Sequence, residues 1–154
     1  LDDSKKLSEK KRNEMFQIIS DRALAIGTGM ADNNTIDKIN ILNATRQAMR
    51  QAVEEAEKQM GEAIGHVLVD AVTIEGIGNE QTAIIKGDAK SISIAAASII
   101  AKVTRDNMMK EYALEYPYYA FESNKGYGTK AHYQGINEHG ITPIHRKTFL
   151  KGIL

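Results

Sequence analysis

The 154 residues have an ordinary globular composition and most simply form one domain, covering residues 1–154. Twenty basic and twenty acidic side chains cancel, so the chain lacks the strong positive charge of a non-specific nucleic-acid binder, although local basic clusters occur. The absence of cysteine excludes disulfides and thiolate metal sites and favours a reducing cytoplasm, and the sequence shows neither a membrane-length apolar run nor a signal-peptide pattern.

Helical periodicity and turn residues organise the first 61 residues. Ser8 is expected to cap a first helix, and the stretch "ALAIGTGMA" (Ala23–Ala31) to form a short strand. The next helix should start at Thr35 or Asp37. Its apolar residues follow the clearest amphipathic pattern of the chain, which ends near Gly61.

Two apolar strands are predicted next, in "HVLVDAV" (66–72) and "TAIIKGD" (82–88). The first is apolar on both alternating faces, as expected of a strand covered by helices on each side. About ten residues separate the strands, which is short for the crossover of a parallel pair. The spacing therefore leaves their relative direction open.

The second half of the chain reads mainly as helices. Residues 91–101 are apolar on nearly all sides, so this helix is expected to be buried and to leave the core at Lys102. A loop containing Tyr127 precedes a last short helix, which is closed by Gly140. An extended tail is expected after it.

Two aspartates are the best candidates for chemistry. Asp70 and Asp88 each follow an apolar strand, and active sites of open α/β sheets collect at the carboxyl ends of strands. Each could instead cap the following turn or helix. As a pair they suit Mg²⁺ or Mn²⁺, because no cysteine and no histidine pair at zinc spacing competes.

Other polar candidates carry weaker signals. Tyr127 lies between two glycines in "NKGYGTK", with two lysines nearby. It could stack on a sugar or base of a nucleic acid, or it could plug the loop into the core. His66, His132 and His139 are assigned surface or structural roles.

Seven stretches together resemble the ordered motifs of ribonuclease HII, the bacterial type 2 ribonuclease H. They are "DDSKKLSEKKR", "IDKINILNATRQAMRQAV", "VLVDAV", "KGDAKSISIAAASIIAKVTRD", "YP", "NKGYGTKAH" and "PIHRKTF". Each motif alone is weak, but their joint order is specific. The resemblance implies an α/β, ribonuclease H-like fold: a mixed sheet flanked by helices. It also implies a cytoplasmic endoribonuclease, expected to be monomeric, that cleaves the RNA strand of RNA–DNA hybrids and single ribonucleotides embedded in DNA.

The resemblance also assigns residues. Enzymes of this family hold two divalent ions, Mg²⁺ or Mn²⁺, with four carboxylates, of which Asp70 matches the third and Asp88 the fourth. Tyr127 matches the tyrosine that packs against the sugar at the RNA–DNA junction. Weaker matches place further residues near the substrate: Ser4, Lys5, Lys6 and Arg146.

One family feature has no counterpart in the 154 residues. The family's first strand carries an aspartate–glutamate pair and a glycine–arginine–glycine motif, whereas Asp2 and Asp3 belong to a later motif. The chain thus resembles the carboxyl-terminal part of the family domain, without its first strands. We expect it to cleave poorly or not at all on its own, and to fold incompletely. Two alternatives remain: a non-catalytic binder of RNA–DNA hybrids, and an unrelated magnesium-dependent phosphotransfer enzyme.

Overall fold

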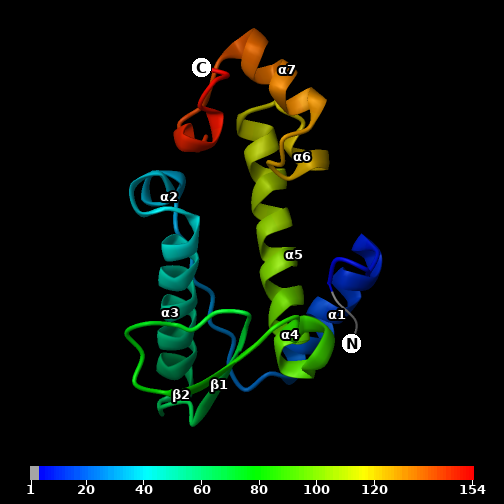
Figure 1. Cartoon of the computed structure of the whole chain (residues 1–154). Coiled ribbons are helices and arrows are strands. Elements are labelled where there is room, and N and C mark those ends of the chain that lie inside the picture. Colours follow the sequence, from blue (N-terminus) through cyan, green and yellow to red (C-terminus); the bar gives the residue numbers. More distant parts are fainter. Residues whose placement is uncertain (1–3) are drawn as a thin grey trace. The chain divides into compact units, whose positions relative to one another are not determined.

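The computed structural model describes residues 4–154, which form two compact units (Figure 1). The first unit runs to Ile100 and includes the tail Arg146–Leu154, and the second is Ala101–His145. The described chain is mostly helical with a small parallel sheet, an α/β architecture consistent with the ribonuclease H-like fold. Asp2 and Asp3 lie outside the described residues, and the single-domain reading stays a prediction.

The first helix, α1 (Glu9–Arg22), begins as expected. The Ser8 side chain accepts a hydrogen bond from the N–H of Lys11 at 3.2 Å, which satisfies one of the free amides of the first turn. No residue of α1 is buried. This helix therefore contributes a surface rather than a core element.

The strand predicted at Ala23–Ala31 is wrong. This segment is not a strand, and it lies along α3 (Ile41–Met60). The Gln59 side chain bonds both the N–H and the carbonyl of Ile26, and the Gln51 side chain accepts from the N–H of Met30. Side-chain amides thus take the place of a neighbouring strand in satisfying the backbone.

The second predicted helix is two helices. The first, α2 (Asn33–Ile39), is capped by Asp32, so both predicted starts lie inside it. Asn40 has a φ of 70°, which breaks the helix, and its side chain caps α3. The predicted end is confirmed, because Gly61 closes α3 in the left-handed conformation with a φ of 72°.

The sheet consists of β1 (His66–Asp70) and β2 (Glu80–Ile84), which pair in parallel with Asp70 opposite Ile84. This settles the direction that the spacing left open: an irregular crossover without a helix joins the strands. In this crossover Ile74 is buried against Val53 of α3 and Val69 of β1.

The prediction that the first strand is covered on both faces is wrong. Val67 and Val69 face the cluster on α3, whereas Leu68, on the opposite face, is 41% exposed. Strand residues alternate between faces, so Asp70 lies on the same open face as Leu68. The acid is thus directed away from the core.

A short helix, α4 (Gly87–Lys90), follows β2, and α5 (Ile92–Glu115) follows it. Within the first unit α5 buries Ile94, Ala95 and Ile99, but Ile92 is 73% exposed. Ala97 and Ala101 are exposed as well, so the expectation of a helix buried on nearly all sides is wrong. Its continuation past Lys102 is confirmed.

In the part of the chain that the structure describes, no helix is long and apolar enough to span a membrane.

The second unit contains α6 (Phe121–Asn124) and α7 (Lys130–His139). The predicted end of the last helix at Gly140 is confirmed. The tail returns to the first unit, where the expectation of an extended chain is wrong, since η1 (Lys147–Leu150) is a 3-10 helix.

The tail is attached by Asp37 of α2, and this attachment should depend on pH. The Asp37 carboxylate accepts hydrogen bonds from the Thr148 hydroxyl, the Thr148 N–H and the Lys147 N–H. The Thr148 bonds in particular hold the pKa of Asp37 below its ordinary value of 3.8. Because the pKa is lower in the folded than in the unfolded chain, the stabilisation is complete above pH 3.8 and is lost as the pH falls through the folded pKa. An NMR titration of the Thr148 amide should show a midpoint below 3.8, and a midpoint at or above it would contradict this attachment.

Candidate active site at the carboxyl end of the sheet

The candidate active site starts from Asp70, the last residue of β1. Its side chain is exposed, and its Oδ1 accepts a hydrogen bond from the N–H of Gly87 at 2.9 Å. The carboxylate is therefore oriented by the first residue of α4.

Asp88 lies one residue further along, in the first turn of α4, and is half-buried. The Gly87 contact thus brings the end of β1 to the segment that carries the second predicted acid. A Cβ on Gly87 would lie 2.6 Å from the Cδ1 of Ile94 and 3.4 Å from the Oδ1 of Asp70. The small residue allows this close approach.

Strained backbone flanks both acids. Ala71, directly after Asp70, has a φ of 65°, and Lys86, two residues before Asp88, has a φ of 55°. Neither residue is glycine, so both conformations are costly and have to be held by their surroundings. Such strain is frequent at functional sites, and here it occurs where both predicted acids lie.

The two aspartates supply only part of the ligands that a metal ion needs. In the described residues 4–154 there is no group of three or more histidine, cysteine or acidic side chains that could hold a metal ion. Asp70 and Asp88 offer oxygen ligands of the kind that hard divalent cations prefer. They fit as two ligands of a larger set.

Tyr127 lies in the second unit, and its side chain is 66% exposed. The alternative in which this tyrosine plugs the loop into the core is thereby excluded. The loop around it is tightly bonded: the Gly126 N–H donates to the side chain of Asn124, and Arg105 donates to the carbonyl of Lys125. The exposed ring is thus presented by an ordered loop.

The weaker candidates occupy different settings. Ser4 is only 3% exposed, and its hydroxyl lies 2.7 Å from that of Ser98, which favours a structural role for its side chain. Lys5 and Lys6 are exposed. The Arg146 guanidinium stacks over the Phe149 ring at 3.7 Å. Their proximity to a substrate remains a prediction.

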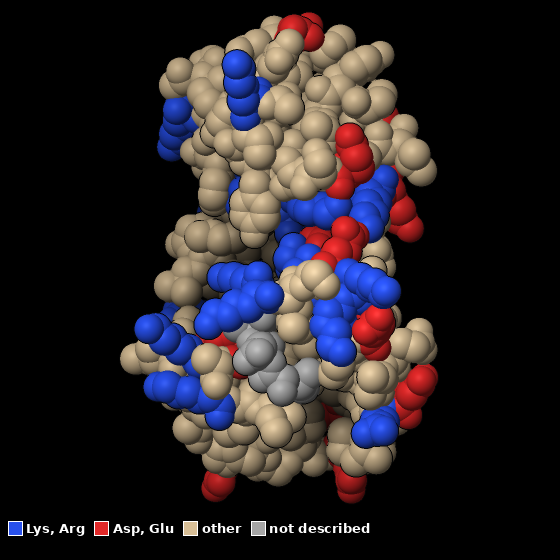
Figure 2. Space-filling view, turned by 90° about the vertical axis from the view of Figure 1, so that its right-hand side faces the viewer, with Lys and Arg blue, Asp and Glu red and all other residues tan. Residues whose placement is uncertain are grey.

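The chain has zero net charge but carries local groups of basic side chains. On the face that Figure 2 draws, several lysine and arginine side chains are visible, with acidic side chains interspersed. This agrees with local basic clusters rather than with a uniformly positive surface. Phosphate contacts from such clusters would position a nucleic acid without reading its sequence.

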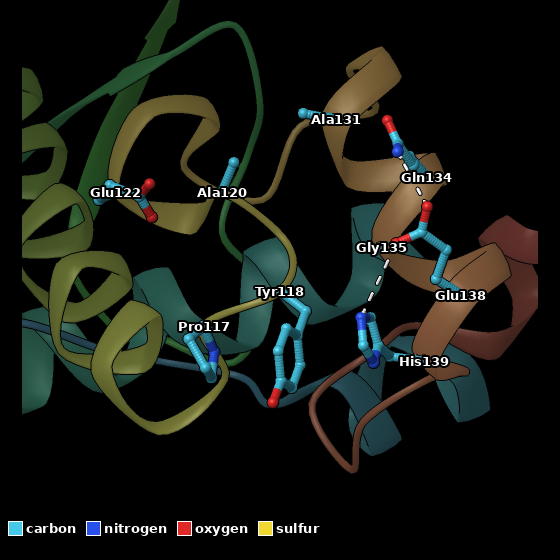
Figure 3. A pocket seen from close by; sticks show the side chains of 9 residues that line it. All are labelled: Pro117, Tyr118, Ala120, Glu122, Ala131, Gln134, Gly135, Glu138 and His139. Carbon is cyan, nitrogen blue, oxygen red and sulfur yellow. Dashed lines mark hydrogen bonds and ion pairs between the residues drawn. The ribbon is translucent and has the colours of Figure 1, made fainter.

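A separate pocket of about 290 Å³ lies in the second unit between the turn after α5 and α7. In Figure 3, the Tyr118 ring stacks on His139, with centroids 3.8 Å apart, and Glu138 bonds Gln134 on the same helix. None of the predicted site residues lines this pocket.

Sequence reasoning missed a buried histidine pair in the second unit. His132 was assigned a surface or structural role and His145 none, yet they are only 7% and 6% exposed and their Nε2 atoms lie 3.0 Å apart. Thirteen residues separate them along the chain, so no local spacing marks the pair.

Comparison with known proteins agrees with the motif reading. The family described as Ribonuclease HII matches residues 1–151. Ribonuclease HII of Clostridioides difficile is 57% identical over 154 residues, covering 100% of this chain and 59% of the relative. The proteins of the same name from Enterococcus faecalis and Ligilactobacillus salivarius are each 52% identical over 149 residues, covering 97% of this chain and 56% of the relative. The chain therefore spans less than three fifths of the length of these curated relatives.

Proposed function

This chain belongs to the ribonuclease HII family, and from that premise we propose that it serves the endonucleolytic cleavage of RNA strands in RNA–DNA hybrids. Single ribonucleotides embedded in DNA are included among its substrates. We propose that the protein acts as a monomer in the cytoplasm, a compartment that suits a chain without cysteine.

The observation that carries the proposal is the contact between Asp70 and the segment of Asp88. A parallel strand pair directs its carboxyl end toward α4, and the 2.9 Å bond to the Gly87 N–H holds the Asp70 carboxylate against the segment that carries Asp88. Both side chains offer the carboxylate oxygens that hard divalent cations prefer, and a bound cation would allow a negatively charged phosphate to approach them. This makes a metal-dependent phosphodiesterase the best-fitting reaction class.

The expected cofactor is Mg²⁺ or Mn²⁺, held by Asp70 and Asp88 together with further oxygen ligands. When bound, such ions supply an activated water and charge stabilisation at the leaving oxygen. The chain's own contribution is to orient Asp70 through the backbone and to keep the site at an exposed sheet edge, where a duplex has access.

Substrate recognition is assigned to Tyr127 and to the exposed lysines. The exposed ring can pack on a sugar, and a 2′-hydroxyl distinguishes RNA from DNA at that position. Exposed Lys5, Lys6 and Lys130 are suited to phosphate contacts, to which Arg146 could add.

Large apolar side chains are exposed around the acids. Leu68 is 41% exposed, Ile85 72% and Ile92 73%. These side chains offer a surface that an added strand could cover. We propose that the family's aspartate–glutamate strand would dock here and complete the ligand set.

The test is a cleavage assay with a DNA duplex containing one ribonucleotide. We expect the 154-residue chain alone to cleave poorly in Mg²⁺ or Mn²⁺, and addition of a peptide carrying the family's first strand to raise the rate, because it supplies the missing carboxylates. The matched control is the same peptide with its aspartate–glutamate pair changed to asparagine and glutamine. Full activity of the chain alone would refute the expected impairment, and no cleavage in any mixture, despite duplex binding, would favour a non-catalytic hybrid binder.

A further inference from the structure

The buried pair His132–His145 lies directly beneath the loop that presents Tyr127. His132 projects from α7, and its Nδ1 lies 2.9 Å from the carbonyl oxygen of Tyr127. Its Nε2 lies 3.0 Å from the Nε2 of His145. A continuous chain of polar contacts therefore connects the buried pair to the exposed tyrosine.

The direction of every donor in this chain can be assigned. The backbone N–H of Thr142 donates to the Nδ1 of His145 at 2.9 Å, so that nitrogen carries no proton. A neutral His145 then holds its proton on Nε2 and donates to the Nε2 of His132. His132 must hold its own proton on Nδ1, where it donates to Tyr127.

This arrangement favours the neutral rings. A proton added to the Nε2 of His132 would face the Nε2–H of His145 across 3.0 Å. Reversing His145 would set an Nδ1–H against the Thr142 N–H and lose that hydrogen bond, although the Thr142 hydroxyl also lies 2.9 Å from this nitrogen. Burial, followed by the proximity of His132, lowers the pKa of His145 to about 4.

Aromatic side chains pack against both rings of the pair. Tyr119 packs edge-on to His145 with centroids 5.1 Å apart, and Phe121 packs edge-on to His132 at 5.2 Å. The titratable groups in ring contact with the pair include Tyr119, whose hydroxyl donates to the Gly140 carbonyl, and Tyr133, with centroids 6.3 Å from His132.

The carbonyl of Tyr127 is the point at which the loop is held. It accepts both the His132 Nδ1–H and the N–H of Thr129. On the other side of the loop, the N–H of Tyr127 donates to the Asn124 carbonyl, and Asn124 is itself buried. The peptide groups on both sides of the exposed ring are thereby fixed.

We infer that His132 and His145 form a neutral positioning pair, which fixes the Tyr127 backbone and so sets the orientation of its ring. The consequence for substrate recognition rests on the function proposed above for Tyr127. The structural claim about the pair stands without it. Neither histidine contacts substrate in this scheme, so both act through the tyrosine.

Nitrogen NMR of the histidine rings in the 154-residue chain tests the structural claim directly. The expected result is a proton on Nδ1 of His132 and on Nε2 of His145. His145 should also stay uncharged at pH values well below 6.5, the ordinary pKa of a histidine side chain. The exposed rings of His66 and His139 provide reference signals. The inference would be overturned by a proton on Nε2 of His132, or by a His145 ring that becomes charged near pH 6.5.

Two substitutions separate positioning from general stability. His132→Phe keeps a ring but removes the donor, whereas His132→Asn keeps an N–H near the position of Nδ1. Relative to the Ile136 amide of α7, His132→Phe should accelerate hydrogen exchange at the Thr129 amide about tenfold, and His132→Asn should restore most of the protection. Equal acceleration at both amides would show a merely structural role and contradict the inference. If His132→Phe fails to fold, the protonation states of the two histidine rings in the unsubstituted chain decide whether the inference stands.

Measurements of duplex binding distinguish two outcomes: a wrong inference about the histidine pair and a wrong proposal about the function of Tyr127. His132→Phe should weaken the preference for a ribonucleotide-containing duplex over all-DNA about threefold to tenfold, the range of one hydrogen bond. Unchanged preference, with the predicted protonation and exchange observed, would refute the recognition role of Tyr127 and leave the pair supported. Weakened preference with the wrong protonation states would refute the pair.

Discussion

Replacing Asp70 or Asp88 with asparagine should lower metal-dependent cleavage by about 10³-fold or more, the scale of a lost electrostatic contribution to phosphoryl transfer. Asparagine matches aspartate in size and keeps an oxygen that can accept from the Gly87 N–H. Either substitution removes a negative charge, and at position 70 the contact that orients the side chain is kept. The rate is measured in the mixture that contains the family's first strand.

Metal binding by the 154-residue chain gives an independent measurement. Mn²⁺ should broaden the NMR signals of Gly87 and Asp88, and either asparagine substitution should weaken this effect about tenfold or more. Glu62→Gln is the matched control, since it removes an exposed carboxylate at a position outside the candidate site. Undiminished broadening and cleavage in both variants would remove Asp70 and Asp88 from the site.

The predicted acids illustrate what a sequence can specify. An aspartate after an apolar strand is a local pattern, and both strands form, although β1 ends at Asp70 rather than at 72 and β2 at Ile84 rather than at 88. The Gly87 contact that joins Asp70 to the segment carrying Asp88 occurs in a parallel strand pair. The spacing could not determine that register, because the crossover is irregular rather than helical.

Burial was harder to predict than periodicity. An apolar strand reads as covered on both faces, but only the face with Val67 and Val69 meets α3. Composition reports that Leu68 and Ile92 are apolar, not which neighbour covers them. The amphipathic pattern of α3 was the reliable signal, because a single helix face and its glycine end are local properties.

Most of the features that could not be predicted from the sequence are contacts between residues far apart along the chain. The His132–His145 pair and the attachment of Thr148 to Asp37 join residues that no short motif links. The segment 23–31 was misread for a related reason. Its small apolar residues suit a strand, but the same glycines allow a helix backbone to approach, and only the three-dimensional arrangement distinguishes the two cases.

Gly29→Ala tests that close approach and should strongly destabilise the fold. A Cβ at this position would lie 1.8 Å from the carbonyl oxygen of Ala48, a backbone atom of α3 that no rotamer change can move. Gly27 meets the Ala52 carbonyl in the same way, at 2.0 Å. The segment would have to separate from α3 and lose the bonds that Gln51 and Gln59 make to it. We expect a loss of about 3 kcal/mol in the free energy of unfolding, the upper part of the range for overpacking.

Thermal and urea unfolding of the 154-residue chain measure this effect. For a chain of this size a loss of about 3 kcal/mol corresponds to a fall in Tm of roughly 6–12 °C. Gly78→Ala is the matched control, because Gly78 is exposed, lacks a positive φ and has nothing within 4 Å of the added Cβ. That variant should be neutral or more stable by up to about 1 kcal/mol, since alanine restricts the unfolded chain. Equal stability of the Gly29 and Gly78 variants would show that the segment 23–31 is not packed against α3.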